Sequence, residues 1–225
     1  TARYEALDAA AAAHGARFVL LGHTLDDQAE TVLLGLGRGS GPKSLAGMSP
    51  VTGSYLRPLL AIRRATTEAF CRDSSLDYWT DPQNSDPRFT RVKLRHEVLP
   101  LLEEALGGGV AEALARTANL LRADASALDQ LAAELFAAEA QVAATSVTLD
   151  CEALAKHPSA LSSRLIKLAI ETVGGQTSAT AIESVTALVL DWHGQKPLTL
   201  SGTRVERTGR SLVFRTTKTL KTGAC

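Results

Sequence analysis

The pattern of hydrophobic and polar positions begins with an α/β rhythm. Residues 2–14 predict a helix that ends at Gly15, a residue suited to the left-handed conformation that follows many helices. Residues 17–22 form a short apolar run, typical of a buried parallel strand, and a second helix is predicted over 26–37. Helix, strand and helix in this order indicate an α/β sheet. One strand cannot form a sheet, and residues 55–60 give at most one short extra strand, so we expect the chain to begin inside a domain.

Turn residues mark the next divisions of the chain. Residues 81–87 are rich in Pro, Asp and Asn and predict a loop. A helix begins at about Phe89, and Pro100 should kink it or split it in two. The glycines at 107–109 interrupt the pattern again, and we place the domain boundary there. The two predicted domains are residues 1–108 and residues 109–225.

The second predicted domain is mainly helical. Residues 111–141 form a long Ala- and Leu-rich helix, residues 146–150 alternate like a strand, and residues 197–215 indicate a β-hairpin. Two more helices are expected, over about 151–173 and 178–193, and the tail after residue 216 should fray. The fold class is therefore α/β: a partial Rossmann-like domain followed by a mainly helical domain with a small hairpin.

Composition limits the function without defining it. The chain is 45% hydrophobic and 21% charged, with a formal net charge of +0, so any RNA contact must come from a local basic patch. The three cysteines, Cys71, Cys151 and Cys225, are isolated, which argues against a zinc ribbon, an iron–sulfur cluster or a disulfide framework and suits a reducing cytosol. We expect a cytoplasmic protein, because no signal peptide opens the chain and no apolar run approaches the roughly 20 residues of a membrane span.

The first candidate site lies where the predicted strand meets the second helix. Gly22 and His23 are followed by the adjacent acids Asp26 and Asp27. Ligands of open α/β sheets bind at this edge of the sheet. A carboxylate there can hold a metal ion that bridges ATP phosphates or can bind a substrate ammonium, and His23 can accept a proton from an attacking amine. The structural alternative is a capping box between Thr24 and Asp27, and both interpretations can hold at once.

A second motif, Arg38-Gly39-Ser40-Gly41-Pro42-Lys43, is similar to a phosphate-binding loop but is not a Walker A sequence, which needs adjacent Gly and Lys followed by Ser or Thr. A glycine helix cap followed by a turn explains the motif without any ligand. The functional interpretation is a flexible basic loop in which Arg38 contacts phosphate or RNA.

A third motif is basic. Arg88, Arg91 and Arg95 are spaced so that one helix face would present three guanidinium groups, which suit phosphate oxygens. No acid interrupts the segment, which favours an RNA backbone as the ligand, while the structural alternative is a solvated helix face. The candidate RNA-binding residues of this segment are Arg88, Arg91, Lys93, Arg95 and His96.

Taken together, these motifs resemble the tRNA(Ile)-lysidine synthetase family of N-type ATP pyrophosphatases, whose fold is of the adenine nucleotide alpha hydrolase type. The resemblance rests on LLGHTLDDQAETVLLGLGRGSG (20–41), SLAGM (44–48), RPLL (57–60) and Asp-Pro-x-Asn-x-Asp (81–86) leading into FTRVKLRHEVLPLL (89–102). It covers about the first half of the chain. The second half is similar in helical character to the RNA-binding domain of the family.

Two features depart from the family pattern. The Ser-Gly-Gly-x-Asp-Ser loop that binds ATP in the family does not occur in this sequence, so we expect the chain by itself to be inactive. Val92 stands where many members carry Asn, which removes a side-chain hydrogen bond but not the basic character around it.

The resemblance implies a reaction with ATP and magnesium on an isoleucine tRNA with a CAU anticodon. ATP adenylates the exocyclic oxygen of the wobble cytidine, and the ε-amine of free L-lysine then displaces AMP. The resemblance implies that His23, Asp26 and Asp27 are catalytic, with the two acids dividing ammonium and magnesium binding, and that Gly22, Arg38 and Ser40 contact ATP. Two alternatives remain: a tRNA-thiolating ATP pyrophosphatase, which the isolated cysteines disfavour, and a non-catalytic tRNA-binding module.

Overall fold

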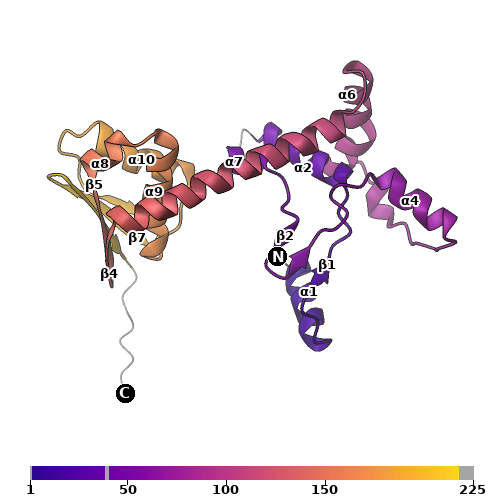
Figure 1. Cartoon of the computed structure of the whole chain (residues 1–225), viewed down its shortest axis with the longest axis horizontal. Coiled ribbons are helices and arrows are strands. Elements are labelled where there is room, and N and C mark those ends of the chain that lie inside the picture. Colours follow the sequence, from indigo (N-terminus) through magenta and orange to yellow (C-terminus); the bar gives the residue numbers. More distant parts are fainter. Residues whose placement is uncertain (1, 39–40, 218–225) are drawn as a thin grey trace. The chain divides into compact units, whose positions relative to one another are not determined.

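The computed structural model describes residues 2–38 and 41–217. The chain divides into two compact units between Ala125 and Ser126, inside the long helix α7 (Val110–Glu139), which follows Gly107–Gly109 (Figure 1). Within the described residues, none of the helices has the length and apolarity needed to cross a bilayer.

The first unit is built of short elements joined by turns. In chain order they are α1 (Ala2–Ala13), β1 (Val19–Leu20), α2 (Leu25–Gly37), α3 (Pro42–Leu45), β2 (Val51–Thr52), β3 (Tyr55–Leu56), α4 (Arg64–Asp73), the 3-10 turn η1 (Pro82–Ser85), α5 (Thr90–Lys93), the π-helical turn η2 (Leu94–Val98) and α6 (Leu99–Ala105). The predicted helices at 2–14 and 26–37 are confirmed, and Gly15 has the positive φ of 60° expected after α1. Helix α4 was not predicted.

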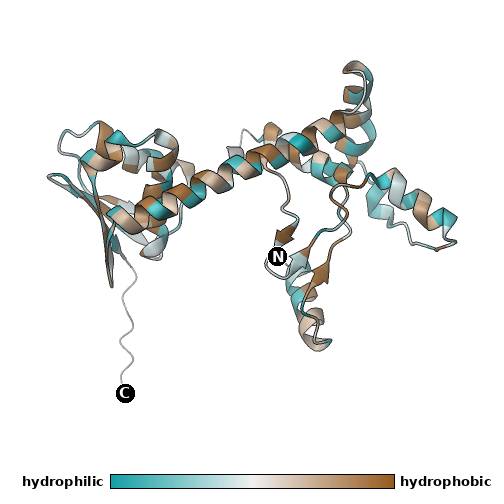
Figure 2. Ribbon diagram, in the orientation of Figure 1, coloured by the Kyte–Doolittle hydropathy of each residue, from teal (hydrophilic) through white to brown (hydrophobic). Residues whose placement is uncertain are grey.

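The strands of this unit form a three-stranded sheet in the order β1-β3-β2. Strand β1 pairs in parallel with β3, Val19 opposite Tyr55, so the parallel pairing and the second short strand are confirmed. Strand β1 is apolar (Figure 2), but the predicted burial of residues 17–22 is confirmed only at Leu21, since Phe18 is 49% exposed and Leu20 is 68% exposed. The strands are only two residues long, and none of the α1 residues is buried.

Helix α2 is fixed by an apolar face. Leu25 and Ala29 are buried together with Leu99 of α6 and with Ala111 and Ala115 of α7. Their spacing places them on one side of α2. Burial of this face leaves the acids at the amino end of α2 on the other side, toward η2 and α4.

The helix that Pro100 was expected to kink or split continues through a π-helical turn. Residues 90–105 run as α5, η2 and α6 without a break, and the Leu99 amide donates to the Leu94 carbonyl five residues earlier. Proline has no N–H to donate and its ring crowds the preceding turn. The wider turn is the adjustment a helix makes to such a residue.

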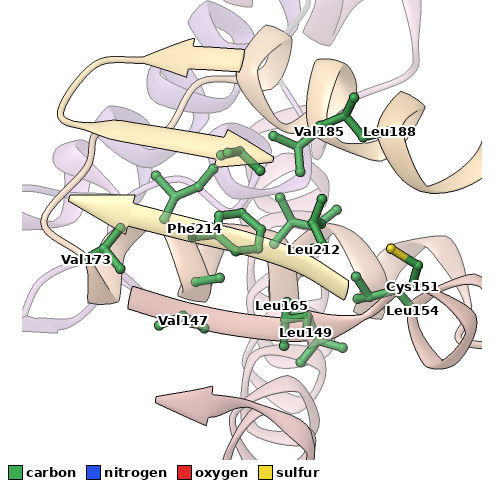
Figure 3. Close-up of a cluster of buried hydrophobic side chains, with 14 residues drawn as sticks. Val147, Leu149, Cys151, Leu154, Leu165, Val173, Val185, Leu188, Leu212 and Phe214 are labelled. Atoms are coloured by element: carbon green, nitrogen blue, oxygen red, sulfur yellow. The ribbon is translucent and has the colours of Figure 1, made fainter. Parts of the chain in front are cut away.

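The second unit is a five-stranded antiparallel sheet with helices against one face. Its elements after α7 are β4 (Gln141–Ala143), β5 (Ser146–Asp150), α8 (Cys151–Lys156), α9 (Ser159–Thr172), α10 (Ala179–Leu190), β6 (Leu198–Leu200), β7 (Thr203–Thr208) and β8 (Ser211–Thr216), with strand order β4-β5-β8-β7-β6. The predicted strand at 146–150 and the hairpin are confirmed. The hairpin is part of this larger sheet, and alternate residues of the strands, such as Val147, Leu212 and Phe214, fill the core (Figure 3).

One helix of this unit was predicted as a single piece. Residues 151–173 form two helices, α8 and α9, separated at His157 and Pro158. The residue before a proline is pushed out of the helical conformation, and His157 has a ψ of 149°. Pro158 therefore ends α8 and begins the turn into α9.

Candidate active site

The amino end of α2 is organised by Asp27. Its Oδ2 accepts hydrogen bonds from the backbone N–H of Thr24 at 2.7 Å and from the Thr24 hydroxyl at 2.8 Å, so the predicted capping interaction is present. Its Oδ1 accepts from Arg64 Nη2 at 2.8 Å. Burial by itself would raise the pKa of Asp27, but the bonds from Thr24 and the charges of Arg64 and Arg95 lower it below its ordinary value. Asp27 is therefore an ionised cap in an ion-pair network.

The neighbouring acid, Asp26, holds α4 in place. Its Oδ2 accepts from the backbone N–H of Arg64 at 2.7 Å, and its Oδ1 lies 3.5 Å from Arg63 Nη2. Arg63 is the residue before the first turn of α4, where backbone N–H groups lack helical partners. Asp26 thus satisfies one of these groups and joins the start of α4 to the start of α2.

Glu30, one turn beyond Asp27, is completely buried and is paired with three arginines. Arg95 Nε donates to its Oε1 at 2.8 Å, Arg91 Nη1 lies 3.6 Å from its Oε2, and Arg64 Nη2 lies 3.9 Å from its Oε1. Arg95 Nη2 also lies 3.4 Å from Asp27 Oδ1. A buried carboxylate is tolerated only when it is paired and hydrogen-bonded. We call the set Asp27, Glu30, Arg64, Arg91 and Arg95 the α2 network.

His23 lies between β1 and α2 with an unsatisfied ring nitrogen. Its Nδ1 is buried and has no hydrogen-bond partner among the described residues. Burial lowers the pKa of His23 below the ordinary 6.5, the negative charge of Asp27 opposes the shift, and Arg57, Arg3 and Arg91 add to it. The imidazole is therefore neutral near pH 7, with a nitrogen available to a ligand or a proton.

The SLAGM segment is explained by Gln28, which is buried on α2. Its side-chain amide donates to the Met48 carbonyl at 3.0 Å and accepts from the Met48 N–H at 2.7 Å. Gly47 has a φ of 60°, and a Cβ there would lie 2.8 Å from the Gln28 side chain. Arg122 of α7 also donates to the Met48 carbonyl, at 2.8 Å. These residues fix the loop after α3 against α2.

A basic cavity of about 550 Å³ opens beside the network. Its lining includes Arg3, Arg38, Arg91 and Arg95, with Asp81 as the acid of the lining. Guanidinium groups bind phosphate oxygens through paired N–H donors. The cavity is thus suited to an anion such as a phosphate ester.

A second cavity, of about 320 Å³, shares Asn84 and Arg95 with the basic one. Its lining also includes Arg64 and Glu68 of α4 and the aromatic residues Tyr78 and Trp79. The two cavities therefore lie on either side of Asn84 and Arg95.

The structure brings together some of the residues singled out from sequence. His23 and Asp27 lie close enough for their charges to interact, Asp26 is beside α4, and Arg38 lines the basic cavity with Arg91 and Arg95. Gly22 is exposed in the β1–α2 loop. Ser40 lies outside the described residues. The cavities lined by Arg91 and Arg95 do not include His23, Asp26 or Asp27 in their walls.

The expectation of three guanidinium groups on one helix face is wrong. Helix α5 begins at Thr90, after Arg88, which is in a turn and pairs with Asp86 at 2.7 Å. Arg91 and Arg95 point to the acids of α2, because Glu30 is buried and requires positive partners. Lys93 is exposed, and the Nε2 of His96 lies 3.4 Å from the Asn84 carbonyl.

Sequence reasoning missed Glu30, the Tyr78–Trp79 pair and the contact of Arg64 with the acids of α2. Glu30 was within the quoted 20–41 motif, one helical turn after Asp27, and that spacing was the available signal. Arg64 had no such signal, since its partners lie 34 or more positions earlier in the chain. Its role depends on the position of α4 in the folded unit.

The partial α/β fold of the first unit is that of a PP-loop domain. In agreement, a family model described as "PP-loop domain" matches residues 1–102. The chain is 56% identical over 216 residues to a tRNA(Ile)-lysidine synthase of Leifsonia xyli, covering 95% of this chain and 65% of that protein.

Two further relatives agree. The tRNA(Ile)-lysidine synthase of Streptomyces coelicolor is 52% identical over 221 residues, covering 95% of this chain and 62% of the relative. That of Mycobacterium tuberculosis H37Rv is 49% identical over 205 residues, covering 90% and 62%. The chain belongs to the tRNA(Ile)-lysidine synthase family. It spans 62–65% of the length of these curated relatives.

Proposed function

We propose that this protein is an ATP-dependent ligase that joins free L-lysine to the wobble cytidine of an isoleucine tRNA with a CAU anticodon. The observation that carries the proposal is the 56% identity over 95% of the chain to a protein named tRNA(Ile)-lysidine synthase. In the first step the exocyclic oxygen of the cytidine attacks the α-phosphate of ATP and pyrophosphate leaves. In the second step the lysine ε-amine forms a bond to the activated ring carbon and AMP leaves.

The basic cavity supports the phosphate chemistry of this proposal. Arg38, Arg91 and Arg95 are part of its lining, and Arg95 is held by two acids of the α2 network. A positioned guanidinium stabilises charge that develops on a transferred phosphoryl group without reorganising during the step. We assign the cavity to the adenylate phosphate and the RNA phosphate next to the modified base. Of the residues expected to contact ATP, Arg38 has this support, while Gly22 and Ser40 stay predictions.

His23 supports the amine chemistry. The ε-ammonium of lysine has a pKa of roughly 10.4 and must lose a proton before or during attack. A neutral imidazole can accept that proton, and burial keeps His23 neutral near pH 7. We assign His23 as the general base. Attraction of the ammonium by Asp26 and Asp27 stays a prediction, because their oxygens already accept hydrogen bonds from neighbouring groups.

Magnesium is expected with ATP, but Asp26 and Asp27 alone do not fit a magnesium site. Both oxygens of Asp27 accept hydrogen bonds from Thr24 and Arg64, and Oδ2 of Asp26 accepts from the Arg64 N–H. Among residues 2–38 and 41–217, no three His, Cys, Asp or Glu side chains gather as a metal cluster requires. Magnesium therefore stays a prediction tied to the ATP phosphates, whose oxygens it prefers, and no step above passes through it.

The direct test is lysine incorporation by the complete protein. Labelled lysine, ATP and isoleucine tRNA with a CAU anticodon should give labelled tRNA, while the same tRNA with uridine at the wobble position should stay unlabelled. A cytoplasmic location agrees with this substrate. Sulfur incorporation without lysine would support the thiolating alternative, and tight tRNA binding without either label would support a non-catalytic binding module.

A further inference from the structure

The Tyr78–Trp79 pair is exposed at the mouth of a charged cavity. Trp79 is 78% exposed and Tyr78 is 55% exposed, and both line the cavity of about 320 Å³ between α4 and the helix of residues 90–105. Exposure of two neighbouring aromatic rings leaves apolar surface in water, and aromatic rings are enriched where a partner covers them. The proposed chemistry of the α2 network uses neither ring.

The charged residues that line this cavity indicate which ligands it can bind. Arg64, Arg95 and His96 line the cavity with one acid, Glu68, so its lining is more basic than acidic. Arg64 and Arg95 are held at 2.8 Å by Asp27 and Glu30, which keeps both guanidinium groups in the wall of the cavity that the rings also line. Each guanidinium carries five N–H donors, more than these two bonds use. Such a lining suits a flat, anionic ligand.

The neighbouring basic cavity indicates that the ligand can be an RNA strand that occupies both cavities, and not only a small molecule in one of them. The two cavities share Asn84 and Arg95, so a chain passing Asn84 can place a phosphate on the arginines and a base on the rings. Single-stranded RNA is recognised in this way, by splayed bases stacked on aromatic side chains and backbone held by cations.

We propose that the Tyr78–Trp79 cavity binds an unstacked nucleobase of the tRNA loop, a nucleotide beside the one that reacts, through stacking on Trp79. This inference rests on the proposed function, because it takes tRNA as the substrate. Free lysine is disfavoured as the occupant, because the cavity lining offers its ammonium groups the carboxylate of Glu68 beside two guanidinium groups. The cavity thereby presents the modified base to the network and adds affinity for a single-stranded loop.

The test uses the complete protein and an RNA stem-loop carrying the CAU anticodon. Trp79→Ala should weaken stem-loop binding by about 10-fold or more, as for loss of one base-stacking ring, and Trp79→Phe should restore most of it. Phe70→Ala is the matched control, because Phe70 is 63% exposed on α4 and does not line the cavity. The salt dependence of binding should stay unchanged in Trp79→Ala, because no phosphate contact is lost.

A second readout reports on the ring itself. Trp79 and Trp192 are the two tryptophans of this sequence, and the difference in fluorescence between the wild type and Trp79→Phe isolates the signal of Trp79. Stem-loop RNA should quench Trp79, and lysine alone should not. Unchanged stem-loop affinity in Trp79→Ala, with lysine incorporation intact in the wild type, overturns this inference and leaves the proposed function standing. A raised KM for lysine with unchanged RNA affinity overturns it in favour of an amino-acid site. No lysine incorporation by the wild type counts against the proposed function instead.

Discussion

Arg95 donates from Nε to Oε1 of Glu30 at 2.8 Å across 65 positions of the chain, and the Glu30 side chain is completely buried. This pair joins η2 to α2 and fixes the wall of both cavities that contain Arg95. The acid that holds the arginine is therefore as important to the candidate site as the arginine itself.

Glu30→Gln should destabilise the first unit by about 3 kcal/mol, because a neutral amide at this fully buried position loses the charge-assisted bonds to Arg91 and Arg95 and turns an NH2 donor toward their guanidinium groups. Urea unfolding followed by circular dichroism measures the change. Glu104→Gln, at an exposed position of α6, is the control and should stay within about 0.5 kcal/mol of wild type. Equal stability of Glu30→Gln and wild type would show that the network contributes nothing to folding.

Alanine variants at Gly47 and Gly53 distinguish the cost of backbone strain from the cost of a steric clash. Both have positive φ, 60° and 58°, but a Cβ at Gly47 would meet Gln28 at 2.8 Å, while nothing lies within 4 Å at Gly53. Gly53→Ala should cost about 1–2 kcal/mol of unfolding free energy from the left-handed conformation alone. Gly47→Ala should cost clearly more, measured in the same urea titration. Equal losses would mean that the Gln28 side chain moves aside freely.

The variants Arg88→Ala and Arg95→Ala should differ in melting temperature. Arg88 has a side chain 87% exposed and pairs with its near neighbour Asp86, so Arg88→Ala should leave the melting temperature unchanged. If it contacts an RNA phosphate, the log–log salt slope of tRNA binding should fall by about one unit. Arg95→Ala should also lower the melting temperature, because it removes the nearest of the three arginines that pair with the buried Glu30. An unchanged slope in Arg88→Ala removes Arg88 from the RNA-binding set.

The roles of Asp26 and Asp27 can be distinguished by measuring both lysine incorporation and the pH dependence of unfolding in their Asn variants. Either Asn variant should reduce lysine incorporation by about 10-fold or more, as for loss of a positioned charge. The ionised Asp27 is stabilised in the folded state, so it contributes stability above its unfolded pKa near 3.8 that is lost as the pH falls through its lower folded pKa. Asp27→Asn should remove this acid-dependent part of the unfolding curve. Wild-type rates in both variants would leave the two acids as structural residues.

His23 should give lysine transfer a characteristic pH dependence. The ratio of wild-type rate to His23→Gln rate cancels the titration of lysine itself. That ratio should rise with pH through a pKa below 6.5 and then level off, at about 100-fold or more for a general base. The unfolded state binds the proton of His23 more readily, so the same shift lowers folding stability as the pH falls below 6.5. A flat ratio would exclude His23 as the proton acceptor.

The sequence by itself determined the features that depend on neighbouring residues. The helices at 2–14 and 26–37, the long helix after Gly109, the strand at 146–150 and the hairpin all follow from local periodicity and turn residues. The Thr24–Asp27 capping interaction was predicted for the same reason, since its partners are three positions apart. Family resemblance was equally accessible, because motif order is a property of the chain.

Only the tertiary structure decided what the charged residues face. Arg91 and Arg95 were expected to face RNA together with Arg88, but they bind Glu30, more than 60 positions earlier in the chain. The arginine pattern alone cannot reveal a buried acid on another helix, because the cost of burying that acid arises only once α2 packs on its neighbours. The cavity beside Trp79 depends in the same way on α4 and η2 meeting at Arg64 and Arg95, a contact that no local pattern encodes.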